Sequence, residues 1–334
     1  MPATAVNGPN SDSHALTLES VMSELRVALG NSGTYVGSRR DEAPRFELFN
    51  APNSICSQKV RAVLEHHGIA YISYSMDMLA GQTYLPAHVR LRMIGCDRLG
   101  VPLMTTHTGS TSVTAGGCDA TVVPTLVDWD TKQVIVDSKR ICFYLDDTIE
   151  DRKRLRPLRL REQIDPQLDV VDNLPNYQML NGRPPGADRR PTTRRGNNGV
   201  DVSMSKVARL DRYLEAYADD AILVRAYRAK HSKELMGAQQ LFSYMATQAA
   251  YERAEAACDR LEHSLNQRAT RWLFGDQMTM ADIFWCIELL RMKNLGAQTF
   301  WAHGVRPAVA AIVDQAETVP ALRAAVLDWP GATY

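Results

Sequence analysis

The stretch TVVPTLVDWDTKQVIVDSKRICFYLDD, residues 121–147, predicts two β-strands followed by a helix. TVVPTLVD and QVIVDS have the apolar, β-branched composition of buried strands, and DWDTK joins them as a turn. SKRICFYLDD has helical spacing, with Ser138 as its expected N-cap. Pro124 interrupts the first strand, where it removes a ladder hydrogen bond, and a cis Val123–Pro124 bond would explain a proline at this place.

Residues 45–78 predict a strand, a helix and a second strand upstream of this unit. RFELFN (45–50) alternates apolar and polar residues, VRAVLEHHG (60–68) places its apolar residues on one helical face, and IAYISYSMDM (69–78) has the composition of a strand. The order β-α-β, connection, β-β-α is that of a thioredoxin-like sheet. We therefore predict an α/β thioredoxin-like N-terminal domain over residues 44–150.

Two further segments belong to the N-terminal part of the chain. Residues 1–43 are polar, contain Ser, Asn and Gly and have no apolar run typical of a signal peptide, so they predict a flexible leader. Residues 91–120 are rich in Gly, Thr and Ser and are far longer than an ordinary connection between strands. We interpret them as an insert and a candidate lid.

From residue 155 to residue 330 the chain predicts an all-α domain, because apolar residues recur at helical spacing with charges on the opposite face. In TMADIFW (279–285), Thr279 and Asp282 have the spacing of a capping box, which we assign to folding rather than to catalysis. Residues 181–199 are rich in Pro, Gly and Arg, which is typical of a solvated loop; the alternative is a loop that contacts an anion or the substrate.

Composition excludes several classes of function. The chain has 334 residues, 45% of them hydrophobic, and equal numbers of basic and acidic residues, 38 of each. Nucleic acid is therefore not expected as a partner. The sequence contains no uninterrupted apolar run of about 18 residues, so no membrane span is predicted. The cysteines lack the spacing of metal sites or of a disulfide framework, so we expect reduced thiols, a cytoplasmic location and no metal. They are Cys56, Cys96, Cys118, Cys142, Cys258 and Cys286.

The features around residues 121–147 also predict a receptor for a small acidic peptide. A cis Val123–Pro124 bond would turn the backbone outward, where an extended peptide can pair with it. Asp137 and Ser138 lie at a helix start, where unpaired N–H groups and the positive end of the helix dipole favour a carboxylate.

Another helix start, within PNSICSQKV (52–60), carries two hydroxyls and a thiol. The positive end of this helix would stabilise a thiolate at Cys56, and Ser54 lies beside it. A peptide held by the receptor would bring its own sulfur to this place.

These motifs resemble the glutathione transferase superfamily over roughly residues 45–330. The resemblance rests on SICSQKVR, on the pair VVPTL and VDS, and on TMADIFW. Within the superfamily the chain is similar to the branch of 2,5-dichlorohydroquinone and tetrachlorohydroquinone reductive dehalogenases. SICS (54–57), HVRLR (88–92), the insert ending in TGSTSV (108–113) and the loop ending in GADRRP (186–191) are the stretches that carry this similarity.

The resemblance implies a glutathione-dependent reductive dehalogenase of aromatic degradation and detoxification, acting as a homodimer. Val123, Pro124, Asp137 and Ser138 would bind glutathione as a cosubstrate. The hydroxyl of Ser54 would activate the thiol of glutathione for attack on a chlorinated hydroquinone. Cys56 would then attack the sulfur of the glutathionyl-hydroquinone, and a second glutathione would resolve the mixed disulfide.

Other functions use the same receptor. A glutathione-dependent β-aryl ether cleaving enzyme, an isomerase of the zeta type and a glutathione-binding module without turnover are the alternatives, and none of them needs Cys56. Cys56 would then be only a small buried side chain, Ser54 only a helix cap, and Asp137 with Ser138 a plain helix start.

The remaining predictions concern the aromatic substrate and the polar side chains of the first helix. The substrate would lie between the domains, with Tyr177, Arg189, Arg190 and Trp329 as candidate contacts, although packing is the favoured explanation for Trp329. We expect the remaining polar side chains of the first helix to be solvated, without a role in the site. They are Gln58, Lys59, Arg61, His66 and His67.

Overall fold

The computed structural model describes residues 17–30, 33–37, 43–195 and 198–333. Its five strands form one mixed sheet in the order β1-β3-β2-β4-β5, in which β2 and β3 are parallel and the other neighbours antiparallel. The strands are β1 (Thr34–Val36), β2 (Phe46–Asn50), β3 (Tyr71–Ser75), β4 (Thr125–Asp128) and β5 (Gln133–Val136). The predicted thioredoxin-like N-terminal domain is confirmed.

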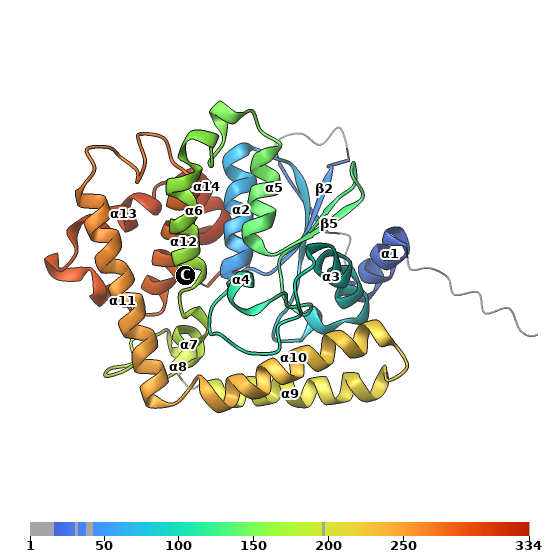
Figure 1. Ribbon diagram of the computed structural model, residues 1–334. Helices are drawn as coiled ribbons and strands as arrows, with labels where there is room; N and C mark the ends of the chain where they lie inside the picture. The colour runs from blue at the N-terminus through green and yellow to red at the C-terminus, as the bar shows by residue number, and fades with distance from the viewer. Residues whose placement is uncertain (1–16, 31–32, 38–42, 196–197, 334) are drawn as a thin grey trace, which may run out of the picture.

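Helices cover both faces of the sheet. On one face lie α2 (Ile55–His67) and α5 (Ser138–Asp147), side by side in Figure 1. On the other lie α3 (Pro86–Leu99) and α1 (Leu18–Leu29), which pack on each other. Every residue of β2 is therefore buried, which the alternation in RFELFN did not indicate.

The buried carboxylate of β2 shows how a charged residue is accommodated there. Glu47 Oε1 accepts hydrogen bonds from Arg26 Nη2 (2.5 Å) and from Trp129 Nε1 (2.8 Å). Because a buried charge is tolerated when it is paired and hydrogen-bonded, these two partners allow an acidic residue within the sheet.

The prediction of a flexible leader over residues 1–43 is wrong for the part that the structure describes. Helix α1 begins at the N-cap Thr17 and ends at Gly30, which has a left-handed backbone. Its apolar side chains Val21, Met22 and Leu25 are fully buried, and β1 pairs with β3. Residues 1–16, 31–32 and 38–42 lie outside the described residues.

The first part of the segment 91–120 is helical, because α3 continues to Leu99. A short helix, α4, covers Val113–Gly116 further along the segment. The interpretation of 91–120 as one inserted loop is therefore corrected to residues 100–120, named here the 100–120 segment. Near its end, Cys118 is joined by a disulfide to Cys96 of α3, and the Cα atoms of the two cysteines are 6.0 Å apart. The expectation of six reduced thiols is wrong for this pair, since the fold brings the end of α3 back to the end of the segment.

The C-terminal part is all-helical, as predicted. In this part lie α6 (Arg161–Asp172), α7 (Asn176–Asn181), α8 (Thr192–Arg195), α9 (Gly199–Ala216), α10 (Ala221–Gln240), α11 (Tyr244–Asn266), α12 (Met280–Asn294), α13 (Pro307–Ala316) and α14 (Pro320–Leu322). Short 3₁₀ turns occur in both parts of the chain, at Gln82–Tyr84 before α3 and, further along, at Asp151–Lys153, Leu158–Leu160, Gln298–Phe300 and Ala302–Gly304. A π-helical turn lies at Arg323–Leu327.

Helices α9 and α10 form a long hairpin, which runs along the lower edge of Figure 1 and packs on α3. Buried ion pairs tie it to the 100–120 segment. Asp119 accepts from Lys230 and Lys233 of α10, each at 2.8 Å, and Glu234 lies 2.9 Å from Lys230. Burial opposes ionisation, but the two lysines hold the pKa of Asp119 well below its usual value.

The capping box at the start of α12 is confirmed. Asp282 Oδ2 accepts from the backbone N–H of Thr279 (2.8 Å) and from its hydroxyl (2.6 Å), while Oδ1 accepts from the Leu273 N–H (2.9 Å). Asp282 is 2% exposed, so these donors depend on the carboxylate and not on water.

We expect Asp282→Ala to lower the free energy of unfolding by about 2 to 4 kcal/mol, because it leaves buried donors without an acceptor. Urea denaturation followed by circular dichroism measures this change. Asp276→Ala, at an exposed position before the same helix, is the matched control and should change it by less than about 0.5 kcal/mol. An equal loss in both variants would contradict the role given to the box.

Candidate active site

Ser54 is the N-cap of α2, as predicted, and its side chain is partly exposed. Its Oγ accepts a hydrogen bond from the Ser57 N–H at 3.3 Å. A hydroxyl that accepts in this way keeps its own hydrogen for donation. Capping and donation to a bound sulfur are therefore compatible at Ser54.

Cys56 is partly exposed, whereas the other free cysteines, Cys142, Cys258 and Cys286, are buried. Burial raises the pKa of the Cys56 thiol, while the charge of Lys59 and a hydrogen bond with Ser138 lower it. Loss of solvation is the largest influence on this thiol and opposes the thiolate that the helix start was predicted to stabilise, so the thiolate stays a prediction.

The Val123–Pro124 peptide bond is cis, as predicted. Pro124 lies directly before β4, which begins at Thr125, so it precedes the strand rather than interrupting it. The guanidinium of Arg92, from α3, donates to the Pro124 carbonyl (2.5 Å) and to Thr125 Oγ1 (2.9 Å). A buried cation that sequence analysis did not identify therefore holds this loop.

The second helix start lies next to Cys56. Asp137 is the N-cap of α5, with a left-handed backbone (φ 71°), and Ser138 is the first helical residue, so the prediction of Ser138 as N-cap is wrong by one position. The Asp137 carboxylate does not cap the helix but accepts from Arg140 Nη1 at 2.9 Å. Burial raises the pKa of Asp137, and the charge of Asp172 adds to this.

The prediction of solvated polar residues on α2 is wrong for Gln58, Lys59 and Arg61, which are all 0% exposed. Helix α2 lies between α5 on one side and α12, α14 and the π-helical turn on the other. The apolar residues at positions 60 and 62–64 are distributed around the axis of the helix, and this pattern could have indicated burial on more than one face.

Lys59 and Arg61 connect the two domains. Lys59 Nζ lies 2.8 Å from Asp172 Oδ1 of α6 and 4.5 Å from the ring centroid of Phe284 of α12. Arg61 donates to the carbonyls of Ala51 (3.0 Å) and Ala325 (3.0 Å).

Of the two histidines expected at the surface, His66 is exposed, but the side chain of His67 is 4% exposed. The ring of His67 lies 2.9 Å from Asp146 of α5, so the prediction is wrong for this residue.

Glu288 of α12 is a further buried acid that sequence analysis missed. Its Oε2 accepts from Asn176 Nδ2 at 3.0 Å, and its Oε1 has no hydrogen-bond partner among the described residues. Burial raises the pKa of Glu288 to about 7, against the opposing charge of Lys59.

The predicted aromatic-substrate contacts are only partly brought together. Tyr177 Oη lies 2.8 Å from Lys206 Nζ, and its ring contacts that of His107 of the 100–120 segment, with 4.2 Å between centroids and a tilt of 30° between the rings. Arg190 is 1% exposed and paired with Asp188 at 2.7 Å, so it is not available to a phenolate, and the loop 181–199 is not simply solvated.

The other two predicted contacts, Arg189 and Trp329, have different surroundings. Arg189 is exposed. Trp329 packs under the Arg61 guanidinium, 4.3 Å from the ring centroid, which favours the packing interpretation.

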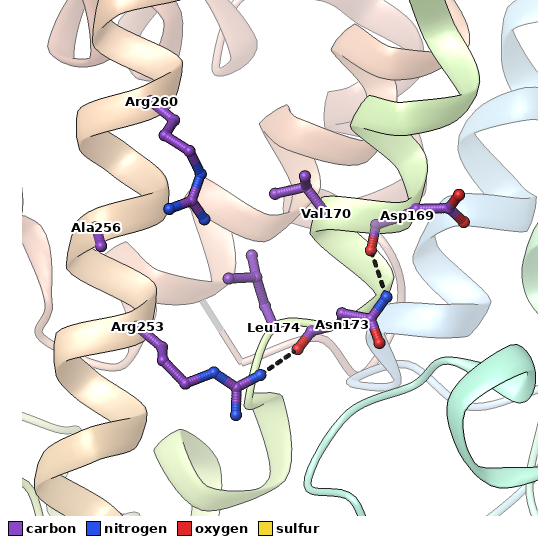
Figure 2. Close-up of a pocket in the computed structure, with 7 residues that line it drawn as sticks. All are labelled: Asp169, Val170, Asn173, Leu174, Arg253, Ala256 and Arg260. Atoms are coloured by element: carbon purple, nitrogen blue, oxygen red, sulfur yellow. Dashed lines mark hydrogen bonds between the residues drawn. The ribbon is translucent and has the colours of Figure 1, made fainter.

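Two hollows lie elsewhere, between α6 and α11. Figure 2 shows the one of about 370 Å³, with Arg253 and Arg260 on one side and Val170 and Leu174 on the other. The second, of about 440 Å³, shares Val170 and Arg260 with it. Neither is lined by the residues at the starts of α2 and α5, so neither is assigned to the candidate chemistry.

Within the described residues no three His, Cys, Asp or Glu side chains are grouped as a metal ion requires. No helix in the described part of the chain is both long enough and apolar enough to cross a membrane.

The raised pKa of Glu288 predicts a pH-dependent stability. The folded state binds this proton more tightly than the unfolded state, so the stabilisation is complete below the ordinary pKa of 4.5 and is lost as the pH rises through about 7. Glu288→Gln should therefore gain stability relative to the wild type between pH 5 and 8, on the order of 2 kcal/mol. Urea unfolding at each pH measures the difference, with the exposed Glu252→Gln as control. Parallel curves for Glu288→Gln and wild type would refute the assignment.

Two family models match the chain. Residues 53–148 match the glutathione S-transferase N-terminal domain, and residues 235–325 match the glutathione S-transferase C-terminal domain. Two curated relatives are named 2,5-dichlorohydroquinone reductive dechlorinase, from Sphingobium indicum strains B90A and UT26S. Each is 34% identical over 291 residues, which cover 86% of this chain and 84% of the relative.

Solved structures agree in fold at much lower identity. The β-etherase LigF from Sphingobium sp. strain SYK-6 matches with a TM-score of 0.53 at 14% identity, covering 84% of this chain and 98% of that one. A zeta-class maleyl pyruvate isomerase matches with a TM-score of 0.51 at 16% identity, covering 86% and 100%. With two family models and relatives at 34% identity, the chain belongs to the glutathione S-transferase superfamily.

Proposed function

We propose that this protein removes chlorine reductively from chlorinated hydroquinones, with glutathione as the thiol cosubstrate. The observation that carries the proposal is the pairing of a hydroxyl, Ser54, and a partly exposed thiol, Cys56, at one helix start. Reductive dechlorination needs both groups, and the relatives at 34% identity are named as dechlorinases. A homodimer and a cytoplasmic location stay predictions.

Glutathione would bind along the starts of the two helices. Its cysteinyl backbone would pair with Val123 beside the cis-Pro124 bond. Its γ-glutamyl carboxylate would lie at the N–H groups of α5, around Ser138, and its amino group at the Asp137 carboxylate. The thiol would then point toward Ser54.

The first step would form a carbon–sulfur bond. Ser54 would donate its O–H to the sulfur of glutathione and so favour the thiolate. The thiolate would attack the ring carbon that bears chlorine, and chloride would leave. The product would be a glutathionyl-hydroquinone.

The second step would break that carbon–sulfur bond. Cys56 would attack the glutathione sulfur, forming a mixed disulfide, while the bonding electrons stay with the ring carbon, which takes up a proton. A second glutathione thiolate would attack the mixed disulfide, releasing oxidised glutathione and restoring Cys56. Overall, two thiols are oxidised to one disulfide, and one C–Cl bond becomes a C–H bond.

Cleavage of β-aryl ethers is the alternative, since displacement of an aryl ether by glutathione uses the same thiolate. The likeness to the β-etherase, at 14% identity, shows the fold alone. Ether cleavage and isomerisation do not include an attack on the glutathione sulfur, so neither reaction requires the thiol of Cys56.

Cys56→Ser should stop the reaction after its first step, because no thiol remains to exchange with the glutathionyl group. Incubation with glutathione and 2,5-dichlorohydroquinone, followed by mass spectrometry, should show glutathionyl-chlorohydroquinone in place of chlorohydroquinone and oxidised glutathione. Cys258→Ala, which changes a buried cysteine of α11, should keep the wild-type products. Clean chlorohydroquinone from Cys56→Ser would remove Cys56 from the mechanism.

Ser54→Ala should slow the first step at least about tenfold, because the glutathione thiol loses its hydrogen-bond donor. The rate of substrate loss at saturating glutathione measures this effect. Ser243→Ala removes the comparable cap of α11, whose Oγ accepts from the Ala246 N–H at 3.2 Å, and controls for helix capping. Equal rates for both variants would leave Ser54 with a capping role alone.

A further inference from the structure

Lys59 lies on α2 three residues after Cys56, so the two side chains belong to the same face of the helix, one turn apart. Its ammonium group is 0% exposed. A lysine in such a position loses its water and depends on its partners to stay charged. The charge of Asp172 does this, since it raises the pKa of Lys59 although burial opposes it.

The acid that holds Lys59 is shared with a second lysine. Asp172 Oδ1 lies 2.8 Å from Lys59 Nζ, while Asp172 Oδ2 lies 3.5 Å from Lys139 Nζ of α5. One carboxylate thus faces two ammonium groups, although Lys139 is also paired with Asp169 at 2.6 Å. The charge of Lys59 also acts on the thiol of Cys56, whose pKa it lowers.

The charges around the Cys56 sulfur come from each element packed against it. Lys59 of α2 and Arg92 of α3 are the cations that interact with it, and Asp137 before α5 and Asp172 at the end of α6 are the anions. Glu288 of α12 acts on Lys59 from the other side.

Stability alone is a weak reason for this buried pair, because apolar side chains of similar size often replace a buried ion pair at no cost. Val60, Val63 and Leu64 of the same helix are buried in the hydrophobic core, so apolar side chains are accommodated along this helix. The placement beside a partly exposed thiol gives the charge a chemical use.

We infer that Lys59 is a positioning residue for the second step of the proposed reaction: its buried ammonium group, fixed by Asp172, stabilises the thiolate of Cys56 for attack on the glutathionyl sulfur. This inference rests on the proposed function for its role in turnover. The effect on the thiol itself can be measured without any turnover.

The test is the pH dependence of alkylation of Cys56 by iodoacetamide, followed by mass spectrometry of the peptide that contains it. The other cysteines are buried or paired in the Cys96–Cys118 disulfide, and Cys56→Ser measures the background. Lys59→Met should raise the pKa of Cys56 by about one unit, which lowers alkylation about tenfold at pH values below both pKa values.

Lys59→Arg is the decisive companion variant, because it keeps a positive charge opposite Asp172, whereas Lys59→Met removes it. Both variants change the packing between α2 and α6, but only an electrostatic effect raises the pKa of Cys56 in Lys59→Met and leaves it near the wild-type value in Lys59→Arg. Lys293→Met, which breaks the surface pair with Glu317, should leave this pKa unchanged. Circular dichroism verifies that each variant is folded.

An unchanged pKa of Cys56 in Lys59→Met, or an equal rise in Lys59→Met and Lys59→Arg, would overturn the inference. If Lys59→Met does not fold, Lys59→Gln takes its place, and an unchanged pKa of Cys56 in that variant overturns the inference equally. Accumulation of glutathionyl-hydroquinone by Lys59→Met, with substrate loss maintained, would support its role in turnover. If the wild type does not dechlorinate but the pKa of Cys56 rises in Lys59→Met and not in Lys59→Arg, the link between Lys59 and Cys56 is retained and the proposed function is rejected instead.

Discussion

The ammonium group of Lys59 and the guanidinium group of Arg61 lie inside the molecule, between the sheet domain and the helical domain. Buried charges are costly unless every group finds a partner, so each residue constrains the distance and orientation of the elements around it. Asp172 of α6 and the carbonyl of Ala325 near the C-terminus meet these constraints. The start of α2, with Ser54 and Cys56, is therefore held in a position that both domains define.

A second group of buried charges lies around the loop before β4. Arg92 of α3 holds the Pro124 carbonyl, and it also donates to the backbone carbonyl of Asp119 at 2.9 Å. The side chain of Asp119 is in turn bound by Lys230 and Lys233 of the α9–α10 hairpin. A continuous set of buried polar contacts thus runs from the hairpin to the cis-proline loop. Most of the hairpin lies between the two segments that match the family models, and only the end of α10 reaches into the second of them.

The order of elements and the caps could be predicted from sequence because they depend on local chemistry. Ser54 accepts from the backbone three residues ahead, and Thr279 with Asp282 closes a box within four residues. The strand pattern around Pro124 was informative for a similar reason, since proline imposes its constraint on adjacent residues. Errors at Ser138 and in the 91–120 segment were errors of boundary, where local signals are weakest.

The sequence by itself determined the fold class, the two helix starts and the residues that carry a hydroxyl and a thiol there. Only the tertiary structure decided which charges surround that thiol. A lysine is ordinarily a solvated residue. The acids that compensate the buried charge of Lys59 are Asp172 and Glu288, which lie 113 and 229 positions further along the chain. Helical periodicity describes one helix against one neighbour, whereas α2 is enclosed by two domains. The electrostatic environment of Cys56 depends on that enclosure, and no local pattern encodes it.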